Sequence, residues 1–303
     1  MALFVFFTIT VVTLLGFSQT LSGGYIEESN PYLYGLSFYT ASIAYYYKTK
    51  HEISLSDIFK ISNPLLISTG PVAIFVKRGR HNSIRHRVNY YLPFILVGIF
   101  YYQIIGFPLI ELFYLIKMTD LISVICFAII FELFVYANFC GLSLIVFGFF
   151  GVLGYRIPLN FKQPFSSSNI VEFWRGWHIS LSMVLKVLFY NPVRKTKSSY
   201  LALFSVFIAS ALWHGTSLNF LLWGCLHAFV FCISIYALKR GSKIFPLIIL
   251  PIGIILGRLI FADTEIDRLF EKLLFSFDGF EAFDLIISSS NTTKVSLTMG
   301  LVL

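Results

Sequence analysis

The chain of 303 residues is 57% hydrophobic and only 13% charged, and its mean hydropathy is +0.80. Since soluble domains carry about 25% charged residues, this composition excludes a water-soluble globular protein and predicts a polytopic membrane protein. The net charge of +8 does not indicate nucleic-acid binding, because the basic residues lie in short clusters between apolar runs and not on one continuous face.

Apolar runs follow one another along the chain, and we expect an all-α integral membrane protein. The runs lie near residues 2–17, 31–47, 61–76, 88–116, 121–155, 200–220, 220–238 and 244–262. Because about 20 helical residues cross the hydrocarbon layer, the chain is predicted to contain roughly seven to nine spans in a single polytopic domain over 1–303. The run at 2–17 lacks a basic leader and a clear small-residue cleavage site, which favours a retained helix over a signal peptide.

The run at 61–76 is short, contains Pro64, Gly70 and Pro71, and has basic residues on both sides. A segment that begins and ends on the same side of a membrane must dip in and return. We therefore predict a re-entrant segment, whose broken backbone has to be buried in protein or line a wet cavity.

Two longer runs are predicted to be kinked or broken. In the run at 88–116 the reason is that proline removes a backbone donor and clashes with the preceding turn. The sequence Gly106-Phe107-Pro108 interrupts the run at 88–116, and the run at 121–155 is long enough for two helices with a break near 138–141. The terminal segment 263–303 begins with charge mixed among leucine and phenylalanine, and we expect it to lie at the membrane interface.

Short basic clusters separate the apolar runs. They lie at Lys48 to His51, Lys77 to Arg87, Arg194 to Lys197 and Lys239 to Lys243. Lysine and arginine near the ends of spans favour the cytoplasmic side, so these loops are predicted to face the cytoplasm of a plasma or bacterial inner membrane. Most of them are expected to orient the chain and to contact anionic lipid.

Two aromatic clusters inside apolar stretches contain histidines. They are Phe173-Trp174-Arg175-Gly176-Trp177-His178, and Leu212-Trp213-His214-Gly215 followed by Trp223-Gly224 and His227. An ionisable group at membrane depth loses its hydration and persists mainly where it serves a pathway or a reaction. These clusters are therefore the predicted functional site.

Further motifs stand in order around these clusters. They are Gly35-Leu36-Ser37-Phe38-Tyr39-Thr40, Gly70-Pro71, Tyr136-Ala137-Asn138-Phe139-Cys140-Gly141, Pro158-Leu159-Asn160-Phe161 and Tyr190-Asn191-Pro192. With the two histidine clusters, this ordered set resembles the bacterial branch of the membrane-bound O-acyltransferase (MBOAT) superfamily, which includes proteins of alginate O-acetylation and of teichoic acid D-alanyl transfer. The resemblance covers the chain from about residue 35 to about residue 275.

The resemblance implies a ring of helices, with re-entrant and broken segments, around a funnel or tunnel that narrows at mid-membrane. His214 would lie at its base and His178 on a loop or short helix beside it. The implied reaction moves an acyl group, expected to be acetyl, from a cytoplasmic thioester donor to a hydroxyl of an extracytoplasmic polysaccharide or cell-wall polymer. The implied donor is acetyl-CoA or an acyl carrier protein, no bound cofactor is expected, and an extracytoplasmic acyltransferase is an implied partner.

Imidazole chemistry supports the same roles. A hydroxyl is a poor nucleophile at neutral pH, and His214 as general base would take its proton and return one to the leaving group. The developing oxyanion needs a fixed donor, which Trp213, Trp223, His178 or an unwound backbone N–H could supply. The residues predicted to bind substrate are Trp174, Arg175, Trp177, Trp213, Trp223, His227 and Asn138.

Simpler roles stay open for several of these residues. The tryptophans also suit interfacial anchoring, Arg175 suits lipid phosphate, and His227 lies one helical turn after Trp223, where it can simply pack. Glu132 is a carboxylate in an apolar stretch, so we expect it to face the protein interior, although the sequence names no partner for it.

The chain departs from the family pattern at two motifs. Asn138 stands where relatives usually carry Asp, and Lys186-Val187-Leu188 stands where they usually read Arg-Asp-Tyr, which removes a carboxylate near the cytoplasmic entrance. We expect altered binding of donor or partner, and an MBOAT-like protein of reduced activity is one alternative.

Two other function classes remain. A transporter or channel with a histidine proton relay fits broken helices and midplane polar groups, but no inverted repeat is visible. A metal-dependent enzyme using His178, His214 and His227 is the weaker alternative, because they form no His-x-x-x-His pair and no carboxylate ligand stands nearby in the sequence.

Overall fold

The computed structural model describes residues 40–41, 44–45, 47–49, 54, 57, 60–61, 63–79, 83–215, 217–262 and 279–302. Helices make up nearly all the regular structure of these residues, and one two-stranded ribbon accompanies them, in agreement with the predicted all-α fold. The predicted helix at 2–17 and the motif residues 35–39 lie outside the described residues.

Four helices in the described residues are long and apolar enough to cross a membrane. They are a 32-residue helix at Ile84–Leu115, α7 (Leu121–Val152), α12 (Leu218–Lys239) and α13 (Ile244–Phe261). A shorter apolar helix, α11 (Ser199–His214), accompanies them. These helices support a membrane protein, whereas the seven to nine spans and the closed ring stay predictions.

The first long helix contains a π-helical stretch where a kink or break was expected. It consists of α5 (Ile84–Ile99), the π-helix η2 (Phe100–Gly106) and α6 (Phe107–Leu115). Pro108 stands inside this continuous helix and has no backbone N–H to donate to the carbonyl of Ile104, four residues earlier. The Ser296 hydroxyl donates to the carbonyl of Ile104 over 2.5 Å, which satisfies an acceptor in the widened stretch. The helix therefore continues through residues 106–108.

α7 shows that the predicted break near 138–141 is wrong, because the helix is continuous over its 32 residues. Gly141 serves packing instead. A Cβ at this position would lie 2.7 Å from the carbonyl oxygen of Gly98 and 2.8 Å from the amide nitrogen of Tyr102. The glycine thus allows α5 and α7 to approach at backbone distance, a use of small residues that is common between membrane helices.

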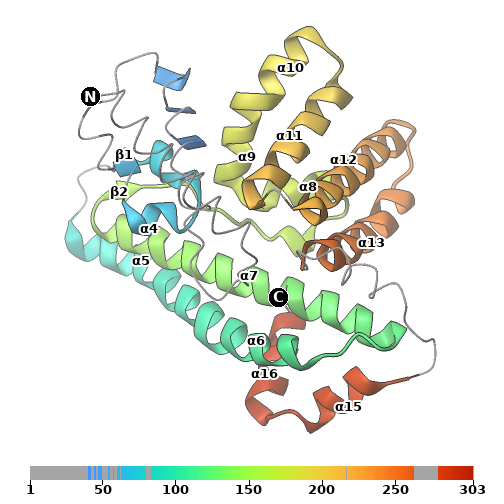
Figure 1. Ribbon diagram of the computed structural model, residues 1–303. Coiled ribbons are helices and arrows are strands. Elements are labelled where there is room, and N and C mark those ends of the chain that lie inside the picture. The colour runs from blue at the N-terminus through green and yellow to red at the C-terminus, as the bar shows by residue number, and fades with distance from the viewer. Residues whose placement is uncertain are drawn as a thin grey trace.

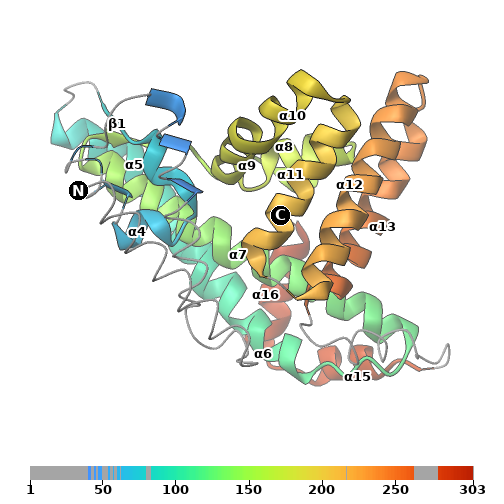
Figure 2. The ribbon, with the colours of Figure 1, turned by 45° about the horizontal axis from the view of Figure 1, so that its top comes forward.

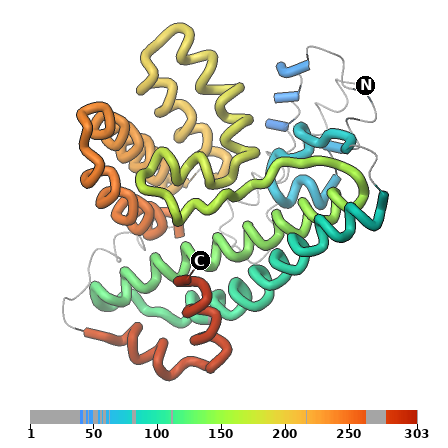
Figure 3. Tube along the Cα trace, turned by 180° about the vertical axis from the view of Figure 1, so that it is seen from behind, coloured from blue at the N-terminus to red at the C-terminus, as the bar shows by residue number. Residues whose placement is uncertain are grey.

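The helices form two groups on either side of α7. The α5–η2–α6 helix runs beside α7 (Figure 1). A second bundle stands on one side of α7 and holds α8 (Ile170–Gly176), α9 (Ile179–Leu185), η4 (Lys186–Tyr190), α10 (Asn191–Thr196), α11, α12 and α13 (Figure 1). The short helix η3 (Pro164–Ser166) leads into α8. On the other side, α15 (Glu281–Ser288) and α16 (Asn291–Val302) pack on α6, η2 and α7 (Figure 3).

The basic clusters gather at one end of the molecule. Figure 2 places β1 (Lys77–Arg78), α10 and the turn between α12 and α13 at the top, and α15 with the turn between α6 and α7 at the bottom. β1 pairs antiparallel with β2 (Tyr155–Arg156), which adds a further arginine to the basic end. This distribution is the one that the positive-inside rule requires, and the assignment of this end to the cytoplasm stays a prediction.

Residues 63–76 form two short helical pieces and not a span. They are α4 (Pro64–Ile67) and η1 (Pro71–Phe75). The backbone between them turns at Gly70, whose φ of +92° favours glycine. Residues 71–74 are buried in the protein. A broken and buried backbone is what a re-entrant segment needs, and its depth in a membrane stays a prediction.

Candidate active site

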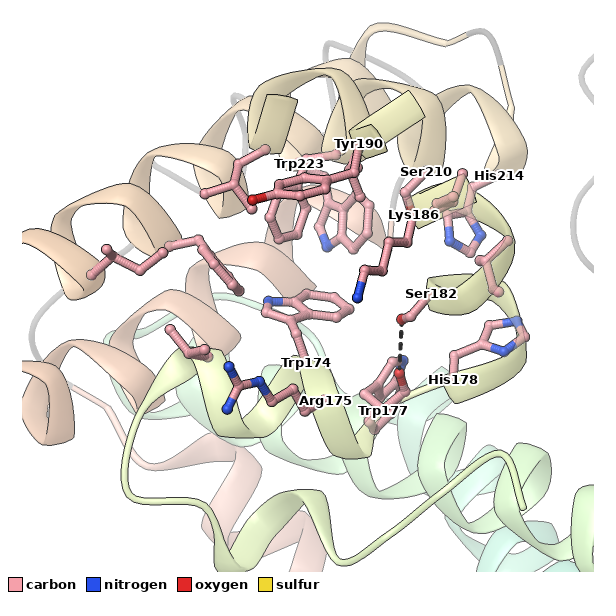
Figure 4. A pocket seen from close by; sticks show the side chains of 18 of the residues that line it. Trp174, Arg175, Trp177, His178, Ser182, Lys186, Tyr190, Ser210, His214 and Trp223 are labelled. Carbon is pink, nitrogen blue, oxygen red and sulfur yellow. Dashed lines mark hydrogen bonds between the residues drawn. The ribbon is translucent and has the colours of Figure 1, made fainter. Parts of the chain in front are cut away.

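A cavity of about 560 Å³ lies among α8, α9, η4, α11, α12 and α13. Both predicted catalytic histidines, His178 and His214, line it. So do four of the residues predicted to bind substrate, namely Trp174, Arg175, Trp177 and Trp223. Figure 4 shows these side chains converging from separate helices on one space. The cavity therefore joins the two sequence clusters that were predicted to form the functional site.

The glycine of Trp213-His214-Gly215 explains how this histidine is placed. His214 is the last residue of α11, and Gly215 ends the helix with a φ of +156°, a conformation that L side chains rarely adopt. A Cβ on Gly215 would lie 2.6 Å from a ring carbon of Phe220. The chain can therefore turn sharply into α12 directly after His214.

The His214 imidazole is half-buried and is held edge-on by aromatic rings. Its centroid lies 4.9 Å from that of Phe261 and 5.5 Å from that of Trp223, at interplanar angles of 81° and 83°. Such edge-to-face contacts fix a ring without using its nitrogen atoms. The imidazole is thus oriented at the cavity wall while its nitrogens stay available for proton transfer.

Trp213 and Trp223 differ in position although both were predicted to bind substrate. Trp223 lies in the cavity wall, at the crossing of α11 and α12, where a Cβ on Gly224 would lie 2.8 Å from the carbonyl oxygen of Phe207. Trp213 is 5% exposed and packs with Leu181 and Leu185, outside the cavity lining. The helix turns Trp213 into the hydrophobic core and leaves its neighbour His214 facing the cavity.

His178 lies between α8 and α9 in a left-handed conformation with a φ of +43°. Two contacts fix its ring. A Cβ on Gly70 would lie 2.4 Å from its Cε1, and the Phe139 ring stands edge-on at a centroid distance of 4.6 Å. Non-glycine residues in this backbone region are uncommon and persist where the surroundings hold them. The Gly-Pro motif and the second histidine of the sequence analysis therefore meet in space.

Asn160 ties these segments together and was not predicted as a site residue. Its side chain donates to the carbonyl of Thr69 over 2.5 Å and to the hydroxyl of Ser143 over 3.3 Å. Its Oδ1 accepts from the amide of Ser180 over 3.2 Å, and its backbone carbonyl accepts from the amide of Ile179 over 2.9 Å. Asn160 is 2% exposed, so these bonds are shielded from water. It connects the two residues that follow His178, the Gly70 turn and α7.

Two buried polar atoms in the cavity wall have no hydrogen-bond partner within the described part of the chain. They are Nε1 of Trp174 and Nδ1 of His178. Buried polar groups are normally paired, and unpaired ones in a cavity are candidates to bind a ligand or water. The Ser182 hydroxyl, by contrast, contacts the carbonyl of Trp177 over 3.5 Å (Figure 4).

Exposed cations line the cavity toward the basic end. Arg175, Lys186 and Lys239 are exposed and contribute to the lining, and Figure 4 shows Lys186 extending into the space. The ammonium of Lys239 lies 5.7 Å from the ring centroid of Tyr200, which joins the end of α12 to the start of α11. Lys186, identified in the sequence as a departure from the family pattern, thus stands at this entrance.

The first turn of α8 is secured by Glu172. Its Oε2 accepts from the amide of Ser168 over 3.0 Å and from its hydroxyl over 2.8 Å, while Asn169 Oδ1 accepts from the Glu172 amide over 3.0 Å. This arrangement resembles a capping box, except that the Glu172 carboxylate bonds Ser168, the residue before the N-cap Asn169. The hydrogen bonds, that from the Ser168 amide foremost, lower the pKa of the Glu172 carboxyl.

His227 and Asn138 lie outside the cavity lining, unlike the other predicted substrate-binding residues. His227 is 3% exposed and packs against Trp174 at a centroid distance of 5.1 Å. A Cβ on Gly257 would lie 2.3 Å from its Nε2, so it fills the interface of α12 and α13. The side-chain amide of Asn138 donates to the backbone carbonyl of Phe134 in the same helix over 3.4 Å. These positions favour packing roles for both.

A buried ion pair supplies the partner that the sequence did not name for Glu132. Nε of Arg258 on α13 donates to Oε2 of Glu132 on α7. Both residues are buried, at 7% and 6% exposure, and Arg258 also lines the cavity. The sequence contains a hint of this pair, because Arg258 is a lone arginine within the apolar run at 244–262. Only the fold, however, places Arg258 beside Glu132.

In the described residues, no group of three or more His, Cys, Asp and Glu side chains stands close enough to hold a metal ion. His178, His214 and His227 are therefore not arranged as a metal-ligand set. The metal-dependent alternative has no supporting geometry in this part of the chain.

Comparison with known proteins identifies the family. The family model of MBOAT, the membrane-bound O-acyltransferase family, matches residues 86–248. The chain belongs to this family. The MBOAT match includes both histidine clusters and ends before Arg258.

Several curated MBOAT-like relatives match parts of the chain. A probable alginate O-acetylase AlgI of Pseudomonas aeruginosa is 30% identical over 161 residues, which are 50% of this chain and 31% of the relative. A peptidoglycan O-acetyltransferase of Helicobacter pylori is 35% identical over 98 residues, 31% of this chain and 18% of the relative. A teichoic acid D-alanyltransferase of Bacillus subtilis is 26% identical over 149 residues, 44% of this chain and 38% of the relative. The chain thus spans well under half the length of these relatives.

Proposed function

We propose that this protein is a membrane O-acyltransferase that moves an acyl group, expected to be acetyl, from a cytoplasmic thioester to a hydroxyl of an extracytoplasmic polysaccharide or cell-wall polymer. The observation that carries the proposal is the position of His214 in the wall of a cavity that exposed cations line toward the basic end. Membership of the MBOAT family and the names of the relatives support the reaction class and the kind of acceptor.

His214 serves as the general base in this proposal. The acceptor hydroxyl gives its proton to the imidazole as its oxygen adds to the thioester carbonyl. The rings of Trp223 and Phe261 hold the imidazole edge-on, so its direction toward the cavity is fixed before substrate binds. A thioester is reactive enough for direct transfer, so no acyl-enzyme intermediate is required.

His178 and Trp174 line the same cavity, and we assign them to substrate orientation. Both have a buried ring nitrogen without a hydrogen-bond partner in the described ranges. Arg175, Lys186 and Lys239 suit the anionic part of a donor such as acetyl-CoA or a carrier-bound acyl group, because they are exposed cations along the entrance. The inner membrane is the proposed location, with the basic end in the cytoplasm.

The proposal is tested in cells that lack the gene and carry either wild type, His214→Ala or His86→Ala. Ester-linked acyl groups on surface polysaccharide and cell-wall polymer are measured by mass spectrometry, and protein abundance in the membrane is measured by immunoblot. His86 is the matched control, because it is an exposed histidine at the basic end and outside the cavity.

We expect His214→Ala to lower the ester content about 100-fold or more at normal abundance, as the loss of a general base predicts, and His86→Ala to retain it. An unchanged ester content in the His214→Ala cells would refute the proposed role of this histidine.

A further inference from the structure

Arg258 is a buried cation at the end of the cavity away from the basic surface. It lies near the C-terminus of α13, a helix that begins at the basic end, and its side chain lines the cavity. Its guanidinium carbon lies 5.1 Å from the ring centroid of Trp177 and 5.7 Å from that of Phe261. Phe261 is also the ring that contacts His214. The guanidinium and the proposed base therefore flank the same aromatic ring.

Placing a full charge here is expensive, and the structure compensates it. Glu132 accepts the Nε–H of Arg258, and the faces of Trp177 and Phe261 lie close enough for cation–π attraction. Ionisable residues within membrane helices are rare and commonly functional. A pair that served only to join α7 and α13 would be replaceable by apolar side chains at little or no cost in stability.

The bond to Glu132 uses the Nε edge of the guanidinium. Arginine carries five N–H donors in a planar fork, and the two terminal nitrogens project beyond Nε. The Arg258 side chain is part of the cavity wall, and its bond to Glu132 restricts the orientation of the fork. Preorganised donors stabilise a negative charge that develops in the transition state.

We propose that Arg258 is a catalytic residue that receives the negative charge formed on the substrate carbonyl oxygen, and that Glu132 is its positioning residue. This assignment rests on the proposed acyltransferase function and replaces the earlier candidates for the oxyanion donor, none of which carries a full charge.

The proposed acyl transfer has an addition stage and an elimination stage. The acceptor oxygen forms a bond to the thioester carbonyl carbon and its proton passes to His214, while the carbonyl π electrons move to the carbonyl oxygen beside Arg258. When the carbonyl re-forms, the C–S bond breaks and the sulfur leaves with the bonding electron pair. The sulfur then takes the proton back from His214, so the enzyme returns to its starting state.

The test uses the full chain, purified in detergent, with acetyl-CoA as the donor probe and a soluble oligosaccharide as the hydroxyl acceptor. Release of the free thiol is the readout. The main variant is Glu132→Met/Arg258→Met, which removes both charges together so that neither is left buried and unpaired. Arg240→Met is the matched control, since Arg240 stands in the turn after α12 and outside the cavity lining. Arg258→Lys keeps the charge and loses the fork.

We expect the double variant to fold and to lose roughly 100-fold in kcat with little change in KM, as removal of an oxyanion donor does. Arg258→Lys is expected to lose about tenfold or more, because a lysine ammonium cannot reproduce the planar fork, and Arg240→Met is expected to match wild type. Wild-type kcat in either the double variant or Arg258→Lys would overturn the proposal. Should the double variant fail to fold, Arg258→Lys decides.

A binding measurement separates this proposal from the proposed function. Propylphosphonate, a stable tetrahedral anion, is added to each protein and the Tm is recorded. We expect a rise of about 5 °C at 100-fold excess over Kd in wild type and Arg240→Met, and no rise in the double variant. An equal rise in the double variant would overturn the role of Arg258. Absence of thiol release by wild type, with the phosphonate shift present, would count against the acyltransferase function and not against the anion site.

Discussion

Replacing Asn160 by alanine removes three side-chain hydrogen bonds and leaves the bond from Ile179 to the backbone carbonyl intact. Each net bond is worth about 1 kcal/mol, and the partners are left in a site that is 2% exposed at Asn160, so we expect a loss of about 3 kcal/mol in the free energy of unfolding. Because the Gly70 turn loses one of its anchors beside His178, we also expect kcat to fall more than KM rises.

The free energy of unfolding is measured by denaturant titration in detergent, and kcat and KM by thiol release from acetyl-CoA. Asn89→Ala is the control, since Asn89 is an exposed asparagine on α5. An Asn160→Ala protein within about 1 kcal/mol of wild type would refute the claim that these bonds hold the segment together. A fall in stability without a change in kcat would leave Asn160 a structural residue and remove its link to His178.

Two further predictions follow from the geometry. Gly70→Ala should lower kcat strongly, because its Cβ would lie 2.4 Å from Cε1 of His178. The control is Gly241→Ala, which has a φ of +81° and nothing within 4 Å of the added Cβ, so it should lower only stability. Similar kcat values for the two variants would contradict this reasoning. The lowered pKa of Glu172 contributes stability that is present above the ordinary glutamate pKa of about 4.3 and is lost as pH falls through the lower folded value. Tm measured from pH 6 down to pH 3 should therefore fall more in wild type than in Glu172→Gln, and parallel curves would show that the capping carboxylate adds no stability.

Composition was sufficient to predict the membrane class, because apolar runs of spanning length need no knowledge of tertiary contacts. The pairing of His178 with His214 in one cavity was also predictable, since each stands in an aromatic cluster within an apolar stretch. The site assignment depended on the family resemblance for the order of motifs. Periodicity alone would not have joined clusters 36 positions apart in the numbering.

The parts that could not be predicted depend on which helices lie side by side. Glu132 and Arg258 are 126 positions apart and meet only because α7 packs on α13. Asn160 looks like a loop residue in the sequence, and its partners come from three separate segments. The break predicted near 138–141 is absent because Gly141 packs closely on α5, which outweighs the low helix propensity of glycine.

The length of α11 has a consequence for the proposed reaction, because it sets the distance of His214 from the basic end. Its 16 residues rise about 24 Å from the basic end, while the hydrocarbon layer is about 30 Å thick. In the proposed orientation, with α11 upright from the cytoplasmic boundary, an imidazole at its last residue would lie about one helical turn short of the opposite boundary. Under the proposed function, the acyl arm of the donor would make most of the crossing, and a polymer outside would need to bring only one sugar hydroxyl to the bilayer.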